Sequence, residues 1–171
     1  MVSLSDYPDI PDIEEDGATF FDNALKKAKS VSEYTGEIVI ADDSGLAVDY
    51  LEGRPGIHSA RYAGDDADDE QNYLKLLEEL RGVDPEHRGA AFKCVLVLYE
   101  PGGTYTAFEG ALRGRITETP VGSEGFGYDP VFYVEAYDKT VAELDPEIKN
   151  HISHRAEAFQ KLKKNLHHLI K

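Results

Sequence analysis

The sequence predicts an α/β domain built around a mixed β-sheet. Apolar residues recur with helical spacing in some segments and in short β-branched or continuous runs in others, and the strand patterns include both a hairpin and isolated strands. Apolar residues make up 41% of the 171 residues, which is enough for a hydrophobic core. No internal repeat or Pro/Gly/Ser linker divides the chain, so we expect one domain over residues 1–171.

Two helices are expected in the first half of the chain. The first covers residues 19–34, with Thr19 as N-cap and Gly36 closing the C-terminal end. The second covers about residues 68–81, where acidic residues in the first turn favour the helix dipole. A third helix is expected from about Ser153, with apolar side chains such as Phe159 and Leu162 facing inward.

Strand patterns lie between these helices. The strongest is residues 91–99, which is apolar on both faces and therefore expected at the centre of a sheet. A Pro-Gly-Gly turn joins it to a returning partner at residues 104–113. Shorter strands are expected at residues 37–41 and 131–134. The first of these should end in a loop at Asp42-Asp43-Ser44-Gly45, because these residue types favour turns.

The charge of the chain excludes several classes of partner. Acidic residues outnumber basic ones by 33 to 18, giving a formal net charge of -15, whereas nucleic acids and anionic membranes need basic surfaces. No apolar run reaches the ~18 residues of a membrane span, and the N-terminus lacks the features of a secretory signal. Cys94 is the single cysteine and cannot form an internal disulfide. We therefore expect a cytoplasmic protein without nucleic-acid or membrane partners.

Two acidic clusters are candidates for chemistry, and the second of them is a candidate for metal binding. Glu14-Glu15-Asp16-Gly17 precedes the first helix, and Asp42-Asp43 follows a strand, at the edge of a sheet where ligands bind in open α/β folds. Magnesium takes one or two carboxylates together with substrate phosphates. Simpler interpretations remain open: the first cluster could only favour the helix dipole, and the second could only cap a turn.

A third cluster favours an anion site. Lys149, His154 and Arg155 lie close together at the expected start of the last helix, where positive charge opposes the helix dipole and therefore has no structural benefit. The nearby segment Phe126-Gly127-Tyr128-Asp129-Pro130 places two aromatic rings next to glycines. These rings could stack on a base, or they could be core aromatics in a turn.

Together and in this order, these clusters resemble the inosine triphosphate pyrophosphatase family. The resemblance runs from about residue 3 to the end of the chain. Its motifs are Ala41-Asp-Asp-Ser-Gly-Leu-Ala-Val-Asp49, Gly53-Arg-Pro-Gly-Ile-His-Ser-Ala-Arg-Tyr-Ala-Gly64, Glu124-Gly-Phe-Gly-Tyr-Asp-Pro130, and Lys149-Asn150 followed by Ser153-His154-Arg155. The resemblance implies a two-lobed α/β domain around a long mixed sheet, with a cleft between the lobes, and a homodimer.

The resemblance also implies an activity and a set of site residues. The activity is hydrolysis of non-canonical purine nucleoside triphosphates such as ITP, dITP and XTP to the monophosphate and pyrophosphate, with Mg²⁺. Asp43 would be the general base and a metal ligand, and Glu14 the second metal ligand. The substrate-binding residues would be Ser44 and Lys27 on the phosphate side, Phe126, Gly127, Tyr128 and Asp129 around the nucleoside, and Lys149, His154 and Arg155, the last two near the purine.

One family motif has no counterpart in this sequence. Family members begin with a strand and a helix that carry a phosphate-binding [ST]-x-N-x-x-K pattern, and nothing before Glu14 matches it. The chain is therefore expected to be N-terminally truncated relative to the family. The alternative function is a nucleotide-binding protein with little or no catalysis.

Overall fold

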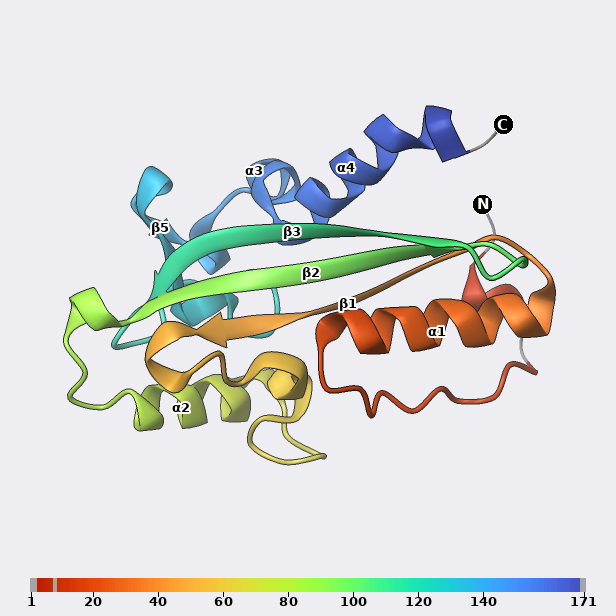
Figure 1. Cartoon of the computed structure of the whole chain (residues 1–171). Coiled ribbons are helices and arrows are strands. Elements are labelled where there is room, and N and C mark those ends of the chain that lie inside the picture. Colours follow the sequence, from red (N-terminus) through yellow and green to blue (C-terminus); the bar gives the residue numbers. More distant parts are fainter. Residues whose placement is uncertain (1–2, 8, 170–171) are drawn as a thin grey trace. The chain divides into compact units, whose positions relative to one another are not determined.

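The computed structural model describes residues 3–7 and 9–169 and confirms the α/β class. Five strands form one sheet in the order β1-β2-β3-β4-β5 (Figure 1). They are β1 (Val39–Val48), β2 (Gly89–Tyr99), β3 (Tyr105–Ile116), β4 (Phe132–Val134) and β5 (Lys139–Thr140). The strands are antiparallel, as in the pairs Arg115–Tyr133 and Val134–Lys139, where the sequence analysis expects a mixed sheet. Each strand follows its sheet neighbour in sequence, so no parallel crossover is needed.

The chain divides into two compact units. The first comprises residues 1–43 and 95–108, and the second comprises residues 44–94 and 109–171. The boundary falls within the long strands β1, β2 and β3, so each of these strands contributes residues to both units.

The first unit is built on helix α1 (Phe20–Thr35). The Thr19 side chain caps its first turn by accepting the N–H of Asp22 at 3.1 Å, and Gly36 ends it with a left-handed φ of 73°, both as expected. Ala24 and Ala28 are fully buried and pack in one apolar cluster with Val95 and Val97 of β2. Small helical residues here allow the helix backbone to lie close to the strand.

The expected loop at Asp42-Asp43-Ser44-Gly45 is wrong, because β1 continues through these residues to Val48. Turn preference is a local property, and here the hydrogen bonds between β1 and its neighbour β2 override it. Successive side chains of a strand point to opposite faces. Asp43 and Ser44 therefore diverge, and they also belong to different units.

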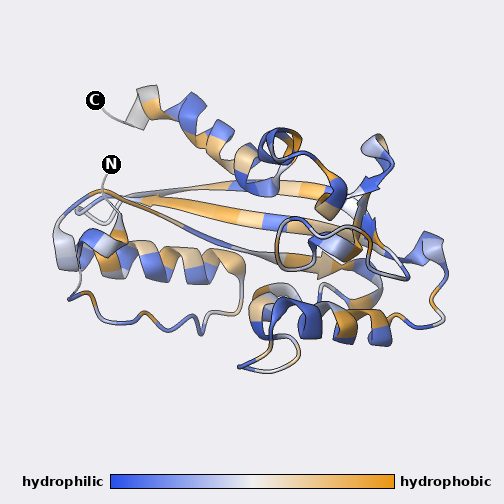
Figure 2. Ribbon diagram, turned by 180° about the vertical axis from the view of Figure 1, so that it is seen from behind, coloured by the Kyte–Doolittle hydropathy of each residue, from blue (hydrophilic) through white to orange (hydrophobic). Residues whose placement is uncertain are grey.

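The second unit contains the larger core. Helix α2 (Asp69–Glu79) begins with a capping box between Asp68 and Gln71, and buries Leu76 and the following Leu80 against strand residues such as Leu46. In Figure 2 the apolar colour runs along β2, while the helices show both colours as amphipathic helices do. The buried side chains of this core include Leu46, Val48, Leu76, Leu80, Phe92, Ile116, Tyr128, Val131 and Phe132.

Two helices end the chain, one more than expected. Helix α3 (Pro146–Ile152) precedes α4 (His154–Leu169), and both lie on the side of the second unit's strands opposite α2 (Figure 1). Leu162 of α4 is buried as expected, whereas Phe159 is 46% exposed, so its expected inward position is wrong. Among the described residues, no helix has the length and hydropathy needed to cross a bilayer.

Candidate active site

The first unit carries a network of ion pairs between α1 and two carboxylates. Lys27 Nζ lies 2.9 Å from Glu15 Oε1 and 3.6 Å from Asp43 Oδ1. Within the acidic segment 14–17, the carboxylate that pairs with Lys27 is therefore that of Glu15. Glu14, the residue that the sequence analysis expects as a metal ligand, is exposed, and no contact from Glu14 to Lys27 or Asp43 is found among the described residues.

Asn23 of α1, which the sequence analysis does not identify, contacts the carboxylate of Asp43. Asn23 is 1% exposed, and its Nδ2 donates to Asp43 Oδ2 at 3.0 Å. Its Oδ1 accepts the backbone N–H of Gly17 at 2.8 Å. Asn23 and Lys27 are four residues apart, so both face Asp43 from the same side of the helix. That spacing to a site lysine is the signal through which the sequence could have pointed to Asn23.

The residues around Asp43 fit a magnesium ion that is completed by substrate. The Asp43 side chain is 11% exposed, and carboxylate oxygens are the hard ligands that Mg²⁺ prefers. Mg²⁺ keeps several waters and takes one or two carboxylates plus substrate phosphates, so a dense cluster of ligands is not required. Among the described residues, the group of at least three metal-capable side chains with ligand atoms within 4.8 Å of one another is Asp84, Glu86 and His87, which are all exposed.

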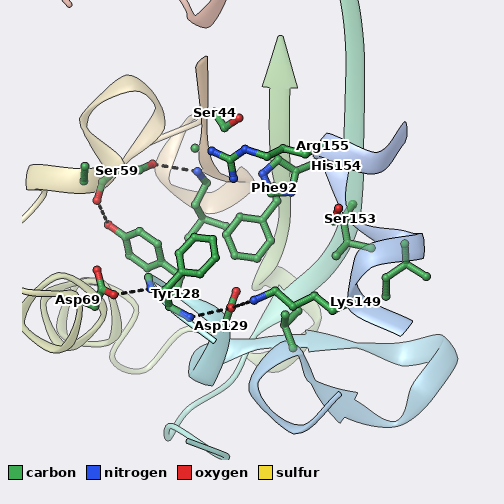
Figure 3. Close-up of a pocket in the computed structure, with 18 residues that line it drawn as sticks. Ser44, Ser59, Asp69, Phe92, Tyr128, Asp129, Lys149, Ser153, His154 and Arg155 are labelled. Atoms are coloured by element: carbon green, nitrogen blue, oxygen red, sulfur yellow. Dashed lines mark hydrogen bonds and ion pairs between the residues drawn. The ribbon is translucent and has the colours of Figure 1, made fainter. Parts of the chain in front are cut away.

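The second unit contains a cavity of about 230 Å³ (Figure 3). Its lining includes every residue that the sequence analysis expects to bind substrate except Lys27, which belongs to the first unit. The expected residues that line it are Ser44, Phe126, Gly127, Tyr128, Asp129, Lys149, His154 and Arg155. The lining also includes residues that the sequence analysis does not name as site residues, among them Ser59, Asp69, Phe92, Leu112, Ile152 and Ser153.

The segment around Phe126 is held by hydrogen bonds along one wall of this pocket. Asp129 is buried, accepts the N–H of Phe126 at 3.0 Å and pairs with Lys149. The N–H of Gly127 donates to Asp69 Oδ2 at 2.7 Å. Gly125 has a φ of 86°, and a Cβ there would collide with the Asp129 carboxylate, so only glycine suits this position.

Tyr128 connects the same segment to the chain after β1. Its hydroxyl donates to the carbonyl of Ser59 at 2.7 Å, and the Ser59 hydroxyl accepts the N–H of Leu46 at 2.9 Å. Burial raises the pKa of Tyr128 far above its ordinary value, so the phenol stays protonated and remains a donor. The ring of Tyr128 therefore has a structural role in the wall of the pocket, in agreement with its burial.

Two aromatic rings of the pocket lie against cationic or titratable groups. Phe126 is 63% exposed, and Lys149 Nζ lies 4.6 Å from its ring centroid. The ring of Phe92 stacks on that of His154 with a centroid distance of 5.3 Å and an interplanar angle of 18°. The exposed Phe126 ring leaves a surface on which a planar base can stack, whereas the Phe92 ring holds the imidazole in place.

The start of α4 directs the remaining polar groups. The Ser153 hydroxyl accepts the N–H of Ala156 at 3.1 Å and so caps this helix end. His154 and Arg155 follow it, and both side chains point into the pocket (Figure 3). Helix α4 also lies very close to Gly110 of β3. A Cβ at this position would collide with the carbonyl oxygen of His154. The pocket thus combines a helix N-terminus with added cations, an arrangement suited to an electron-rich ligand.

A family assignment agrees with this arrangement. The model of the Ham1 family matches residues 1–165. The chain belongs to the Ham1 family. It is 52% identical over 164 residues to the dITP/XTP pyrophosphatase of Shouchella clausii, covering 96% of this chain and 83% of that protein. It is 56% identical to that of Bacillus licheniformis, covering 94% and 82%.

Solved structures of similar proteins have the same fold as this Ham1-family protein. The Ham1 protein of Staphylococcus aureus superposes with a TM-score of 0.92 at 44% identity, covering 97% of this chain and 85% of that one. The nucleoside-triphosphatase, or dITP/XTP pyrophosphatase, of Mycobacterium abscessus gives a TM-score of 0.83 at 45% identity, covering 94% and 82%.

Proposed function

We propose that this Ham1-family protein hydrolyses non-canonical purine nucleoside triphosphates, namely ITP, dITP and XTP, to the monophosphate and pyrophosphate. The observation that carries the proposal is the pocket of the second unit, where Lys149, His154 and Arg155 converge in a chain of net charge -15. A cluster of basic side chains in one pocket of so acidic a protein favours an electron-rich ligand, and the aromatic surface beside it suits a nucleotide base. The relatives from Shouchella clausii and Bacillus licheniformis are dITP/XTP pyrophosphatases, which supports a non-canonical purine substrate here.

The bond broken is a phosphoric anhydride. A water molecule attacks the α-phosphorus, the bond from this phosphorus to the bridging oxygen breaks, and pyrophosphate leaves. Asp43 orients this water and accepts its proton, the role of a general base. Asp43 and a second carboxylate would hold Mg²⁺, which when bound would neutralise charge on the phosphate oxygens. Lys27, which lies 3.6 Å from Asp43 Oδ1, adds a positive charge beside the carboxylate and binds a phosphate oxygen.

Base selectivity follows from the donors of the pocket. A 6-oxopurine presents an acceptor where adenine presents an amino group, so a donor such as Arg155 is satisfied by O6 and left unpaired by adenine. Sites built on such hydrogen bonds can discriminate by about 10⁴-fold or more. Asp129 pairs with Lys149 and accepts the N–H of Phe126, so it fixes the wall that carries the Phe126 ring, against which the base stacks.

Two neighbouring residues, Glu14 and Glu15, are candidates for the second carboxylate of the metal site. The resemblance assigns it to Glu14, whereas the ion pair with Lys27 favours Glu15. We propose Glu15, because Lys27 holds it and Asp43 through one ammonium group. The proposal further includes Mg²⁺ as the metal, a homodimer and a cytoplasmic location, as the sequence analysis expects.

Release of pyrophosphate tests the proposed function. The chain is incubated with Mg²⁺ and with inosine, xanthosine, adenosine or guanosine triphosphate in turn, and pyrophosphate is measured. We expect strong release from inosine and xanthosine triphosphates and little from adenosine triphosphate. Guanine also carries O6, so the donor role of Arg155 does not by itself exclude guanosine triphosphate. Tight nucleotide binding without release from any would instead identify a nucleotide-binding protein without catalysis. Equal release from all four would contradict the role given to Arg155.

A further inference from the structure

The amide of Asn23 has a demanding place in the first unit. It is buried, and it bridges two groups that are far apart in sequence, the backbone N–H of Gly17 and the carboxylate of Asp43. A backbone N–H only donates and a carboxylate only accepts, so the amide oxygen must face Gly17 and the amide nitrogen must face Asp43. Among short side chains, only asparagine offers an acceptor and a donor in this fixed planar arrangement.

The bridge on the Gly17 side is tight. A Cβ on Gly17 would lie 2.6 Å from Asn23 Oδ1 and 2.7 Å from the Cβ of Asp22, so a side chain there would break the contact. Gly17 follows the acidic segment that contains Glu15, and Lys27 pairs with Glu15 at 2.9 Å. The acidic segment is therefore tied to α1 at three points, by Asn23 to Gly17, by Lys26 to Asp16 at 2.6 Å and by Lys27 to Glu15.

The bridge on the Asp43 side fixes the orientation of the carboxylate. Asn23 Nδ2 holds Oδ2 at 3.0 Å while Lys27 Nζ lies near Oδ1 at 3.6 Å, so each oxygen has its own α1 partner. A carboxylate attached to a strand can rotate about its Cβ–Cγ bond, and this rotation is broad for aspartate. Two donors from one helix restrict that rotation.

We propose that Asn23 is the positioning residue of the metal site, fixing the plane of the Asp43 carboxylate and joining the Glu15 segment to the same helix. The inference rests on the proposed function, which makes Asp43 a metal ligand. Asn23 touches neither metal nor substrate in this scheme. Outer partners that orient metal ligands typically contribute 10- to 100-fold in metal affinity or activity.

A purely structural role is the competing explanation, and the second unit offers a matched case. Asn72 of α2 is also buried, its Oδ1 accepts the N–H of Ala63 at 2.8 Å, and its Nδ2 donates to the carbonyl of Ala60 at 3.1 Å. It bridges two backbone groups and no carboxylate. Asn72 therefore reports what loss of a buried amide bridge on a helix does to stability alone.

Metal binding by the nucleotide-free protein tests the inference. The variants Asn23→Ser and Asn72→Ser remove the two bridges, because a serine hydroxyl is too short to reach both partners. Mn²⁺ is titrated as a spectroscopic probe, and the free ion is followed by electron paramagnetic resonance. We expect the Mn²⁺ dissociation constant to rise by about 10- to 100-fold in Asn23→Ser, and to stay at the wild-type value in Asn72→Ser, while both variants melt at lower temperature. A folded Asn23→Ser variant with wild-type Mn²⁺ affinity would overturn the inference.

A second variant separates the two halves of the bridge. Asn23→Asp keeps the volume and an acceptor for Gly17, but it replaces the donor to Asp43 by a carboxylate oxygen. We expect kcat to fall by about 10-fold or more with a much smaller change in KM, because base recognition lies in the pocket of the second unit. A wild-type kcat in this variant would overturn the claim about Asp43, also where Asn23→Ser fails to fold. If the wild-type chain releases no pyrophosphate, the proposed function fails, and Mn²⁺ binding alone decides the inference.

Discussion

The two units of this protein hold their candidate site residues in different ways. In the first unit the residues are charged and partly exposed, and helix α1 holds them through ion pairs and one amide. In the second unit they line a cavity. Buried Asp129 and aromatic rings form its walls, and the side chains of His154 and Arg155 at the start of α4 also line it. The first arrangement suits metal and phosphate, which need charge and water. The second suits a base, which needs apolar surface with a few directed polar groups.

In the proposed mechanism, turnover and base recognition depend mainly on separate sets of contacts, although Ser44, which the resemblance places on the phosphate side, lines the pocket of the second unit. Every contact of Lys27, Asn23 and Asp43 described above lies within the first unit, and every pocket residue lies within the second. Substitutions in the first unit should therefore change turnover, and substitutions in the second should change which nucleotide is accepted. The following experiments test this division, from the largest expected effect to the smallest.

The largest effect is expected for Asp43→Asn. This change keeps the size of the side chain but removes the base, so kcat for inosine triphosphate should fall by about 10²- to 10⁴-fold. Nucleotide binding should persist, because the base pocket is untouched. Pyrophosphate release and a separate nucleotide-binding assay measure the two quantities. A variant with full activity would eliminate Asp43 as the base.

A smaller effect is expected for the second carboxylate of the first unit. Glu15→Gln should weaken metal binding and lower activity by about 10- to 100-fold, because Lys27 holds Glu15 beside Asp43. Glu14→Gln is the matched control on the adjacent residue and should change both quantities much less. The Mg²⁺ concentration for half-maximal activity measures the difference. The reverse order would return the ligand role to Glu14, as the sequence resemblance implies.

In the second unit, Arg155→Ala should change selectivity more than turnover. Loss of the guanidinium removes a donor that distinguishes O6 from an amino group, so the ratio of kcat/KM for inosine over adenosine triphosphate should fall by about 10-fold or more. Competition between the two nucleotides measures this ratio directly. An unchanged ratio would show that another group reads the purine edge.

The smallest effect concerns how α4 is anchored within the second unit. The N–H of Ala111 donates to Glu157 at 2.8 Å, and Lys161 pairs with the same side chain at 2.8 Å, so these contacts lower the pKa of Glu157. A lowered folded-state pKa means that the stabilisation is present above the ordinary glutamate pKa and is lost as pH falls through the folded value. Glu157→Gln should therefore be less stable than wild type at neutral pH, and the difference should shrink on acidification.

Urea unfolding at a series of pH values measures this prediction. The two proteins are compared at each pH, so that effects of other acidic groups cancel. A difference that stays constant below the ordinary pKa of glutamate would show that the Glu157 carboxylate does not stabilise the contact between α4 and β3.

Local features of the fold could be read from the sequence. Thr19 and Gly36 mark the ends of α1 because capping depends on residues within one turn of the helix. The apolar run of β2 identifies a buried strand, because a strand buried on both faces is apolar at successive positions and this pattern is visible in the sequence. The sequence motifs of the second unit also predict residues that lie together, since Phe126, Lys149 and Arg155 all line the same pocket, while their roles stay predictions.

Other features depend on partners that are distant in sequence. Asp42-Asp43-Ser44-Gly45 favours a turn locally, and only the hydrogen bonds to β2 make it part of a strand. Phe92, Ser59 and Asp69 join the pocket through packing of strands and helices that no short motif describes. Each of these residues also has an ordinary structural use, so its type alone could not reveal a site.

The sequence by itself determined the class of fold, the ends of α1, the buried strand β2 and the family motifs, because each is encoded in neighbouring residues or in a recognisable order of motifs. The tertiary structure alone decided that Lys27 pairs with Glu15, twelve positions away, and that Asn23 bridges to Asp43, twenty positions away. The physical reason is that an ion pair or a buried hydrogen bond depends on distances of a few ångströms in space. Folding sets those distances, and the spacing of residues along the chain does not.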